Sequence, residues 1–226
     1  MGLLDLVQNR AVTDRLAKSL NGAGVIPFVG AGLSAPYQLP QWGELLQKMT
    51  ATANDRAEVD RLVGNNDYEG AAQFLLQSAG PDRFQIVLRE TLNVPIDTRK
   101  RTALAKLLEL PRGPIITTNF DRVLESVFEA ATVHLNVVIG NRKDAIRDAF
   151  SYREDTLIKI HGDLGDAAER VLVPEEYDNA YSTWLENVFR NLATVPILFL
   201  GYSLKNDRPV QVLERLKKEG KTSAVS

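Results

Sequence analysis

The sequence contains no cysteine among its 226 residues. Disulfide bonds, a thiolate nucleophile and a cysteine-ligated zinc ion are therefore excluded. Histidine is nearly as scarce. Since only two histidines are present, a three-histidine metal site is also excluded. We accordingly expect a function that needs no metal, and the lack of cysteine makes the reducing cytoplasm the simplest location.

The sequence also lacks an excess of charge of one sign and any long apolar run. Lysine plus arginine number 27 against 29 for aspartate plus glutamate, a formal net charge of −2. This balance predicts no electrostatic footprint for nucleic acid or for an anionic membrane. No apolar run is long enough to span a bilayer, and no signal-peptide pattern is present. With 44% hydrophobic and 25% charged residues, the composition is typical of a soluble globular protein.

The most informative stretch begins with a short apolar segment, Val25 to Val29, that ends in Gly-Ala-Gly-Leu-Ser. The pattern predicts a buried strand that leads into a tight turn. Gly30 allows a turn that a side chain would block, and Gly32 lets the backbone approach a bulky anion. Free N–H groups in such a turn point toward a phosphate. The spacing from Gly30 to Ala35 also fits a dinucleotide fingerprint, with an ordinary strand-to-helix turn as the alternative.

Residues 53 to 110 are predicted to be almost wholly helical. Apolar residues recur at helical spacing in segments 58–63, 68–77, 82–92 and 98–108, which glycine-, asparagine- and proline-rich stretches separate. A dinucleotide-binding dehydrogenase would instead show a second strand soon after its first helix. The helical block therefore argues against a hydride-transfer enzyme.

Further apolar segments are predicted to be strands, and three of them end in polar residues. Residues 114–117 run into Thr117-Thr118-Asn119-Phe120-Asp121, residues 156–160 into His161-Gly162, and residues 195–200 into Gly201-Tyr202-Ser203. Residues 133–139 form another candidate strand, in which a structural or surface role is favoured for His134. A helix cap explains one of the polar residues at 117–121, but not all of them.

His161 is the candidate general base. A histidine at the carboxyl end of a strand, next to a flexible glycine, is well placed to take a proton from a hydroxyl or from water. A satisfied core histidine is the alternative, and the polar residues at the other strand ends argue against it. We expect the pKa of His161 to lie near neutrality.

The four motifs, in this order and at this spacing, resemble the sirtuin superfamily, particularly the bacterial sirtuin-like domains of anti-phage defence proteins. The resemblance covers about residues 24 to 216. It implies an α/β fold with three layers and a Rossmann-like parallel sheet of the sirtuin (DHS-like) NAD/FAD-binding type, with an inserted helical subdomain. It also implies a single domain over residues 1–226, with its core at about 22–50 and 111–220 and the helical insertion at about 53–110.

The resemblance implies roles for individual residues. In sirtuins the Gly-Ala-Gly-x-Ser turn holds the NAD phosphates, which here implies Gly30, Ala31, Gly32 and Ser34. The nicotinamide and ribose pocket of the family corresponds to Thr117, Thr118, Asn119 and Asp121, and Asn119, Asp121 and His161 are implied to be catalytic. The Gly-Thr-Ser segment that contacts phosphates and the adenosine ribose corresponds to Gly201 and Ser203.

The sequence departs from the deacylating sirtuins at several points. It lacks their four zinc-binding cysteines, and Thr118 and Tyr202 stand where those enzymes usually have glutamine and threonine. These differences weaken the case for an acyl-lysine peptide groove. They resemble the defence branch, whose members cleave NAD rather than deacylate protein.

The resemblance thus implies an NAD+ hydrolase that releases nicotinamide with ADP-ribose or a cyclic form, as a cytoplasmic effector of abortive infection. NAD is the substrate, and no metal is expected. Two alternatives stay open: an NAD-dependent protein deacylase, and a non-catalytic NAD-binding or assembly module. Because unregulated depletion would kill the host, we expect a gate, either a homo-oligomer or a larger complex with a helicase-like or Argonaute-like partner. Direct contact with nucleic acid or membrane is not expected.

Overall fold

The computed structural model describes residues 7–22, 24–100, 102–110, 113–140, 142–152, 155–165, 167–192, 196–203 and 208–218. The chain folds around a five-stranded, wholly parallel sheet in the order β3-β4-β2-β1-β5. The strands are β1 (Ile26–Val29), β2 (Ile115–Thr117), β3 (Asn136–Ile139), β4 (Thr156–Lys159) and β5 (Ile197–Leu200). The three central strands are buried at every position, as short apolar runs predict for a parallel sheet covered on both faces.

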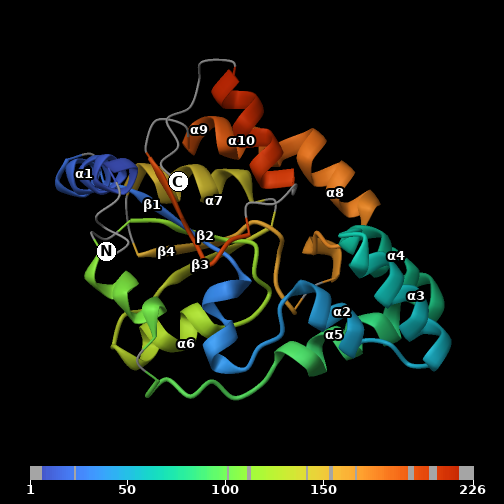
Figure 1. Ribbon diagram of the computed structural model, residues 1–226. Helices are drawn as coiled ribbons and strands as arrows, with labels where there is room; N and C mark the ends of the chain where they lie inside the picture. The colour runs from blue at the N-terminus through green and yellow to red at the C-terminus, as the bar shows by residue number, and fades with distance from the viewer. Residues whose placement is uncertain are drawn as a thin grey trace.

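Helices cover both faces of the sheet and give the molecule three layers (Figure 1). One face carries α7 (Lys143–Tyr152), α9 (Glu186–Leu192) and α10 (Arg208–Lys218), and the π-helical segment Tyr181–Leu185 joins α8 (Pro174–Ala180) to α9. The other face carries α6 (Val123–Ala130) and the 3-10 helix η4 (Ala103–Glu109). The long helix α1 (Val7–Asn21) precedes β1. Because side chains alternate along a strand, Phe28 packs on the first face and Val29 on the second.

Between β1 and β2, the residues that the structure describes form helices and no strand. Two short 3-10 turns, η2 (Ala31–Leu33) and η3 (Ala35–Tyr37), are followed by α2 (Trp42–Lys48), α3 (Ala53–Gly64), α4 (Tyr68–Ala79) and α5 (Pro81–Leu92). The helices α2 to α5 pack on one another and lie together beside the sheet (Figure 1). Their buried side chains, among them Leu46 and Leu88, belong to the core on the α6 face. Helix α4 also contacts α8.

The predicted fold class is confirmed: a parallel sheet lies between two helical layers, and a helical block follows the first strand. The α-helix expected over residues 98–108 is wrong. Asp97 accepts a hydrogen bond from the Arg99 N–H, and Thr102 accepts one from the Leu104 N–H. Such side chain-to-backbone bonds compete with helical ones, and among the described residues of this segment only the 3-10 helix η4 forms. The assignment of one domain over 1–226, with its core at 22–50 and 111–220, stays a prediction.

The register of the strands brings their carboxyl ends to one level. Val29 lies beside both Thr117 and Leu200, and Lys159 lies beside both Thr117 and Ile139. Because the strands are parallel, the residues that follow them meet along one edge of the sheet, where α/β proteins bind their ligands. These are the residues that the sequence motifs singled out.

Glycine is required where β1 and β5 end together. The Gly30 N–H donates to the Leu200 carbonyl oxygen and the Gly32 N–H to that of Gly201, each over 2.9 Å. A Cβ atom on Gly30 would lie 2.6 Å from the Gly201 carbonyl oxygen, and one on Gly201 would lie 2.5 Å from the Leu33 nitrogen. Gly201 also has φ at +63°, in the left-handed region. The two turns therefore interlock through their backbones.

We predict that Gly201→Ala lowers the free energy of unfolding by at least about 2 kcal/mol, because the new Cβ meets both a left-handed φ and neighbouring backbone. Gly64→Ala is the matched control: it lies at the end of α3 with nothing within 4 Å of the added Cβ. We expect that control to be unchanged or stabilised by roughly 0.5–1 kcal/mol. Denaturant unfolding measures both, and equal stabilities would contradict the interlocked turns.

Candidate functional site

Thr117 sets the direction in which the chain leaves β2. Its hydroxyl donates to the Val29 carbonyl oxygen (2.8 Å) and accepts from the Asn119 N–H (3.0 Å). Thr117 and its neighbour Thr118 are both buried. The Thr117 hydroxyl thus supplies hydrogen bonds where the regular backbone pairing of the sheet stops. It holds Asn119 close to the end of β1.

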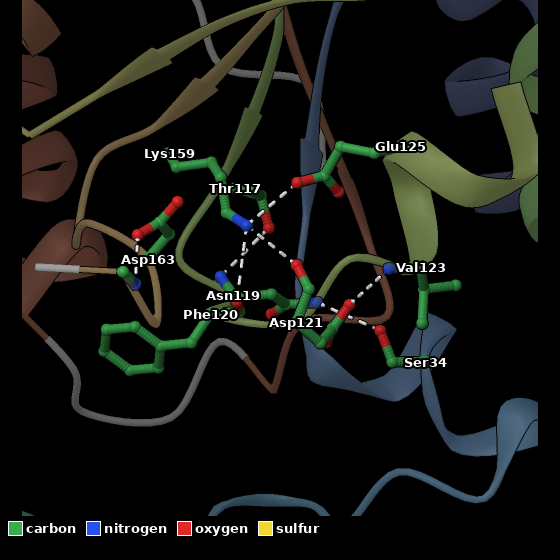
Figure 2. A network of polar contacts seen from close by, with 10 residues as sticks. Ser34, Thr117, Asn119, Phe120, Asp121, Val123, Glu125, Lys159 and Asp163 are labelled. Atoms are coloured by element: carbon green, nitrogen blue, oxygen red, sulfur yellow. Dashed lines mark hydrogen bonds and ion pairs between the residues drawn. The ribbon is translucent and has the colours of Figure 1, made fainter. Parts of the chain in front are cut away.

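Ser34 lies next to both Asn119 and Asp121. The Asn119 Nδ2 donates to Ser34 Oγ over 3.2 Å, and the Ser34 side chain is close enough to the Asp121 carboxylate to oppose the rise in the pKa of that group. Figure 2 shows these side chains gathered between the ends of the strands and the start of α6. All three are at least 92% buried, since their exposed fractions are 2%, 8% and 8%. The glycine turn after β1 and the polar loop after β2 therefore form one hydrogen-bonded cluster, as the sheet-edge argument predicts.

Asp121 both caps a helix and belongs to this cluster. Its Oδ1 accepts a hydrogen bond from the Val123 N–H over 2.9 Å, at the start of α6. Burial raises the pKa of Asp121, and this effect outweighs the opposing effects of the bonds from Val123 and Ser34 and of the nearby Lys159 charge. A carboxylate that stays buried at a strand end, although burial removes its hydration, is typical of functional sites.

Lys159 is a buried polar residue that the sequence motifs do not single out. It is the last residue of β4, and only 1% of it is exposed. Its Nζ donates to the carbonyl oxygens of Phe120 (3.3 Å) and Asp121 (2.8 Å) and to Glu125 Oε1 (3.0 Å). The signal that could have found it is a lysine inside an apolar strand, because lysine is almost never fully buried unless it is paired.

His161 lies outside the Ser34 cluster, in an aromatic enclosure. Its Nε2 lies 2.9 Å from the Tyr181 hydroxyl, and its ring meets the Tyr177 ring edge-on at a centroid distance of 5.2 Å. In the ranges that the structure describes, its Nδ1 has no hydrogen-bond partner, and no hydrogen bond joins its side chain to Asn119 or Asp121. His161 is thus at the expected strand end, but other groups occupy its surroundings.

The expectation that His161 has a near-neutral pKa is wrong for this conformation. Burial of the ring lowers its pKa from 6.5 to about 3. The ring is therefore neutral at physiological pH, which is the form that can accept a proton. Because Tyr181 is hydrogen-bonded to Nε2 and only 3% of His161 is exposed, water does not reach this ring nitrogen in the described conformation.

Arg208, the first residue of α10, closes the same enclosure from outside. Its guanidinium pairs with Glu69 of α4 (2.8 Å) and with Asp178 of α8, and it lies 5.1 Å from the centre of the Tyr177 ring. These contacts join three elements that are far apart in the sequence. The walls around His161 are therefore held by ion pairs as well as by packing.

The amides of the glycine turn have other partners than the predicted phosphate. The amides of Gly30 and Gly32, which the sequence assigns to phosphate, donate to the carbonyl groups of Leu200 and Gly201. Ala31 is half-buried and Ser203 is exposed. Tyr202 packs edge-on against Phe28, at a centroid distance of 5.1 Å. In this conformation the turn after β5 lies where a ligand of those two amides would have to lie.

In the part of the chain that the structure describes, no three residues among His, Asp and Glu are placed to hold a metal ion. In the same ranges, no helix is both long and apolar enough to cross a membrane.

Comparison with known proteins identifies relatives of this chain. The model of a family described as SIR2-like domain matches residues 114–226, which are 113 of the 226 residues. The protein named NAD(+) hydrolase ThsA from Cytobacillus dafuensis is 27% identical over 210 residues, covering 88% of this chain and 39% of the relative. Its namesake from Acinetobacter baumannii is 24% identical over 215 residues, with coverages of 93% and 42%.

A third relative, Defense-associated sirtuin 2 of Bacillus subtilis, is 25% identical over 215 residues, 92% of this chain and 21% of that protein. The chain therefore spans less than half the length of each of these three relatives. The resemblance to bacterial sirtuin-like defence proteins is confirmed by these matches.

We predict that Asp121→Asn is at least as stable as the parent protein. Because burial raises the pKa of Asp121, the ionised form lowers stability as pH rises above 3.8 toward the higher folded-state value. The asparagine amide oxygen still accepts from the Val123 N–H but carries no charge. Asp121→Ala loses this cap and should be about 1 kcal/mol less stable than Asp121→Asn in thermal or denaturant unfolding at pH 7. An asparagine variant less stable than the alanine variant would refute this view of Asp121.

The low pKa of His161 predicts a pH-dependent stability. Between pH 6.5 and about 3 the unfolded chain binds a proton at this residue that the folded chain does not, so stability falls as the pH is lowered. Compared with His161→Gln, which does not titrate, the parent should lose about 1.2 kcal/mol between pH 6 and 5. Denaturant unfolding at several pH values measures this difference, and parallel curves for the two proteins would contradict it.

Proposed function

This chain belongs to the SIR2-like domain family, and from that premise we propose that it is an NAD+ hydrolase. Relatives that carry the name NAD(+) hydrolase align with 84% to 93% of it. The observation that carries the proposal is the hydrogen bond between Asn119, after β2, and Ser34, in the turn after β1, with the buried Asp121 carboxylate beside them. This cluster lies at the carboxyl edge of a parallel sheet, which is the usual place for a nucleotide.

The proposed reaction converts NAD+ and water to nicotinamide, ADP-ribose and a proton. The bond between the nicotinamide nitrogen and the ribose carbon breaks, and its electron pair leaves with neutral nicotinamide. Water then forms the new bond to that carbon and gives up a proton. The transition state carries positive charge on the ribose. A buried, ionised Asp121 would stabilise that charge strongly, since electrostatic interactions gain strength where water is excluded.

The remaining site residues take the roles that the resemblance implies. Asn119 would hold the ribose or the attacking water through its amide, and His161 would accept the proton from that water. Thr117 and Thr118 would line the nicotinamide and ribose side. We assign the phosphates to the turns Gly30, Ala31, Gly32, Ser34 and Gly201, Ser203.

The proposal requires an opening step before the reaction. Tyr181 occupies the proton-accepting nitrogen of His161, and the turn after β5 occupies the amides of Gly30 and Gly32. Tyr181 begins a π-helical segment, a wide turn that often marks functional positions. We propose that the described conformation is a resting form. A homo-oligomer, or a larger cytoplasmic defence complex with a helicase-like or Argonaute-like partner, would release it.

The test is cleavage of NAD+ by the purified chain and by Tyr181→Phe, with products identified by chromatography and mass spectrometry. Loss of the Tyr181 hydroxyl should raise the rate, because it frees His161 Nε2. In the same background, His161→Gln or Asn119→Ala should lower the rate by about 10²–10⁴-fold. His134→Gln, at the exposed second histidine, is the matched control and should leave the rate unchanged.

Water labelled with ¹⁸O separates the products, because linear ADP-ribose incorporates the label and a cyclic product does not. Bound NAD+ that neither protein cleaves would overturn the hydrolase proposal in favour of a binding module. Deacylation of an acyl-lysine peptide without free NAD+ cleavage would overturn it in favour of a deacylase.

A further inference from the structure

We propose that Lys159 is a positioning residue, which sets the loop of Asn119 and Asp121 by holding two of that loop's main-chain carbonyl groups. The inference deepens the function proposed above and rests on it for the role of the loop. Lys159 touches neither the Asn119 side chain nor the Asp121 carboxylate through a hydrogen bond in the described residues. It acts on them through the backbone.

Each of the three N–H donors of Lys159 has an acceptor. An ammonium group has three N–H bonds, and here they reach the Phe120 carbonyl, the Asp121 carbonyl and Glu125 Oε1 at 3.3, 2.8 and 3.0 Å. Figure 2 shows the Lys159 nitrogen at the centre of the network, between the loop and Glu125 on α6. Two of its three bonds therefore go to the loop that carries the site.

The loop needs an external donor at this point. Residues 118–122 form neither helix nor strand, so the sheet and α6 do not satisfy the carbonyl groups of Phe120 and Asp121. Buried carbonyl groups without a partner are costly, and almost all find one. The adjacent strand β4 presents Lys159 to them, because Thr117 and Lys159 are paired in register.

The loop is thereby held from several sides. Thr117 anchors the Asn119 N–H, Lys159 anchors two carbonyl groups, and the Phe120 ring packs edge-on against Trp42 at 6.1 Å between centroids. The side chain of Asn119 then donates to Ser34, and the Asp121 carboxylate accepts from the Val123 N–H. Removing Lys159 leaves the side-chain bonds in place but frees the backbone between them.

A purely stabilising role explains Lys159 poorly. A buried ion pair is often no more stabilising than apolar side chains of similar volume, because both charges lose their hydration. Glu125 supports the lysine with one oxygen, while its Oε2 is buried without a hydrogen-bond partner among the described residues. The costly pair at this place is therefore explained by the loop geometry that it enforces. Its positive charge also favours the ionised form of Asp121.

The experiment separates positioning from charge balance with three variants. Lys159→Met removes the donors and leaves Glu125 unpaired, Lys159→Met with Glu125→Leu removes both charges, and Glu125→Gln keeps the lysine and an acceptor for it. We expect Lys159→Met to lower kcat by about 10- to 100-fold with KM changed less than threefold, and to move the acidic limb of the kcat profile to higher pH. The double variant should recover the parent's Tm but not its kcat, and Glu125→Gln should retain kcat within threefold.

Recovery of both Tm and kcat in the double variant would overturn the proposal, because Lys159 would then only balance the charge of Glu125. A second readout needs no activity: hydrogen exchange of a peptide covering residues 118–123 and Trp42 emission in a Trp184→Phe background. Both should change in the double variant relative to the parent, because Phe120 shifts against Trp42. Unchanged exchange and emission would refute the positioning role. Bound NAD+ that neither the parent nor Tyr181→Phe cleaves would refute the hydrolase proposal alone.

Discussion

The parallel register of β1, β2, β4 and β5 is the constraint on which the rest of the structure depends. It places Leu200, Val29, Thr117 and Lys159 side by side, so segments that are far apart in the chain leave the sheet at one edge. The hydrogen bonds of Thr117, Ser34 and Lys159 all cross between these strand ends. A slip of one residue in any pairing would turn alternate side chains to the other face and separate the cluster.

The site concentrates polar groups that are expensive to bury. Asp121 is kept in place by the N-terminus of α6 and by Ser34, Lys159 by Glu125 and two carbonyl groups, and His161 by becoming neutral. The free-energy cost of burial is reduced differently for each group: by capping a helix, by pairing with an opposite charge, or by losing its own charge. Such a collection is hard to explain by stability alone, and it is what a site for charged chemistry requires.

In this conformation, a nucleotide does not have free access to the residues that the proposed function assigns to the site. The contacts between His161 and Tyr181 and between the glycine turns occupy the groups to which the proposed function assigns proton transfer and phosphate binding. Arg208 adds ion pairs to two other helices around the same enclosure. Under the function proposed above, this arrangement would keep these residues protected until some interaction opens it, as an enzyme that consumes NAD+ would require.

The sequence by itself determined the parallel α/β class, the approximate strands and the position of the polar motifs at their ends. These features follow from local signals, since apolar runs, glycines and hydroxyl residues act on the backbone near them. It also identified Asn119, Asp121 and Ser34, which the strand register then brought into contact. Only the tertiary structure decided three further features: Lys159 holds the loop, His161 is bonded to Tyr181 and its burial lowers its pKa, and the end of β5 with the turn after it accepts the amides of Gly30 and Gly32. The reason is physical: burial and hydrogen-bond partners from distant segments depend on how the layers pack, and no local pattern of residues encodes them.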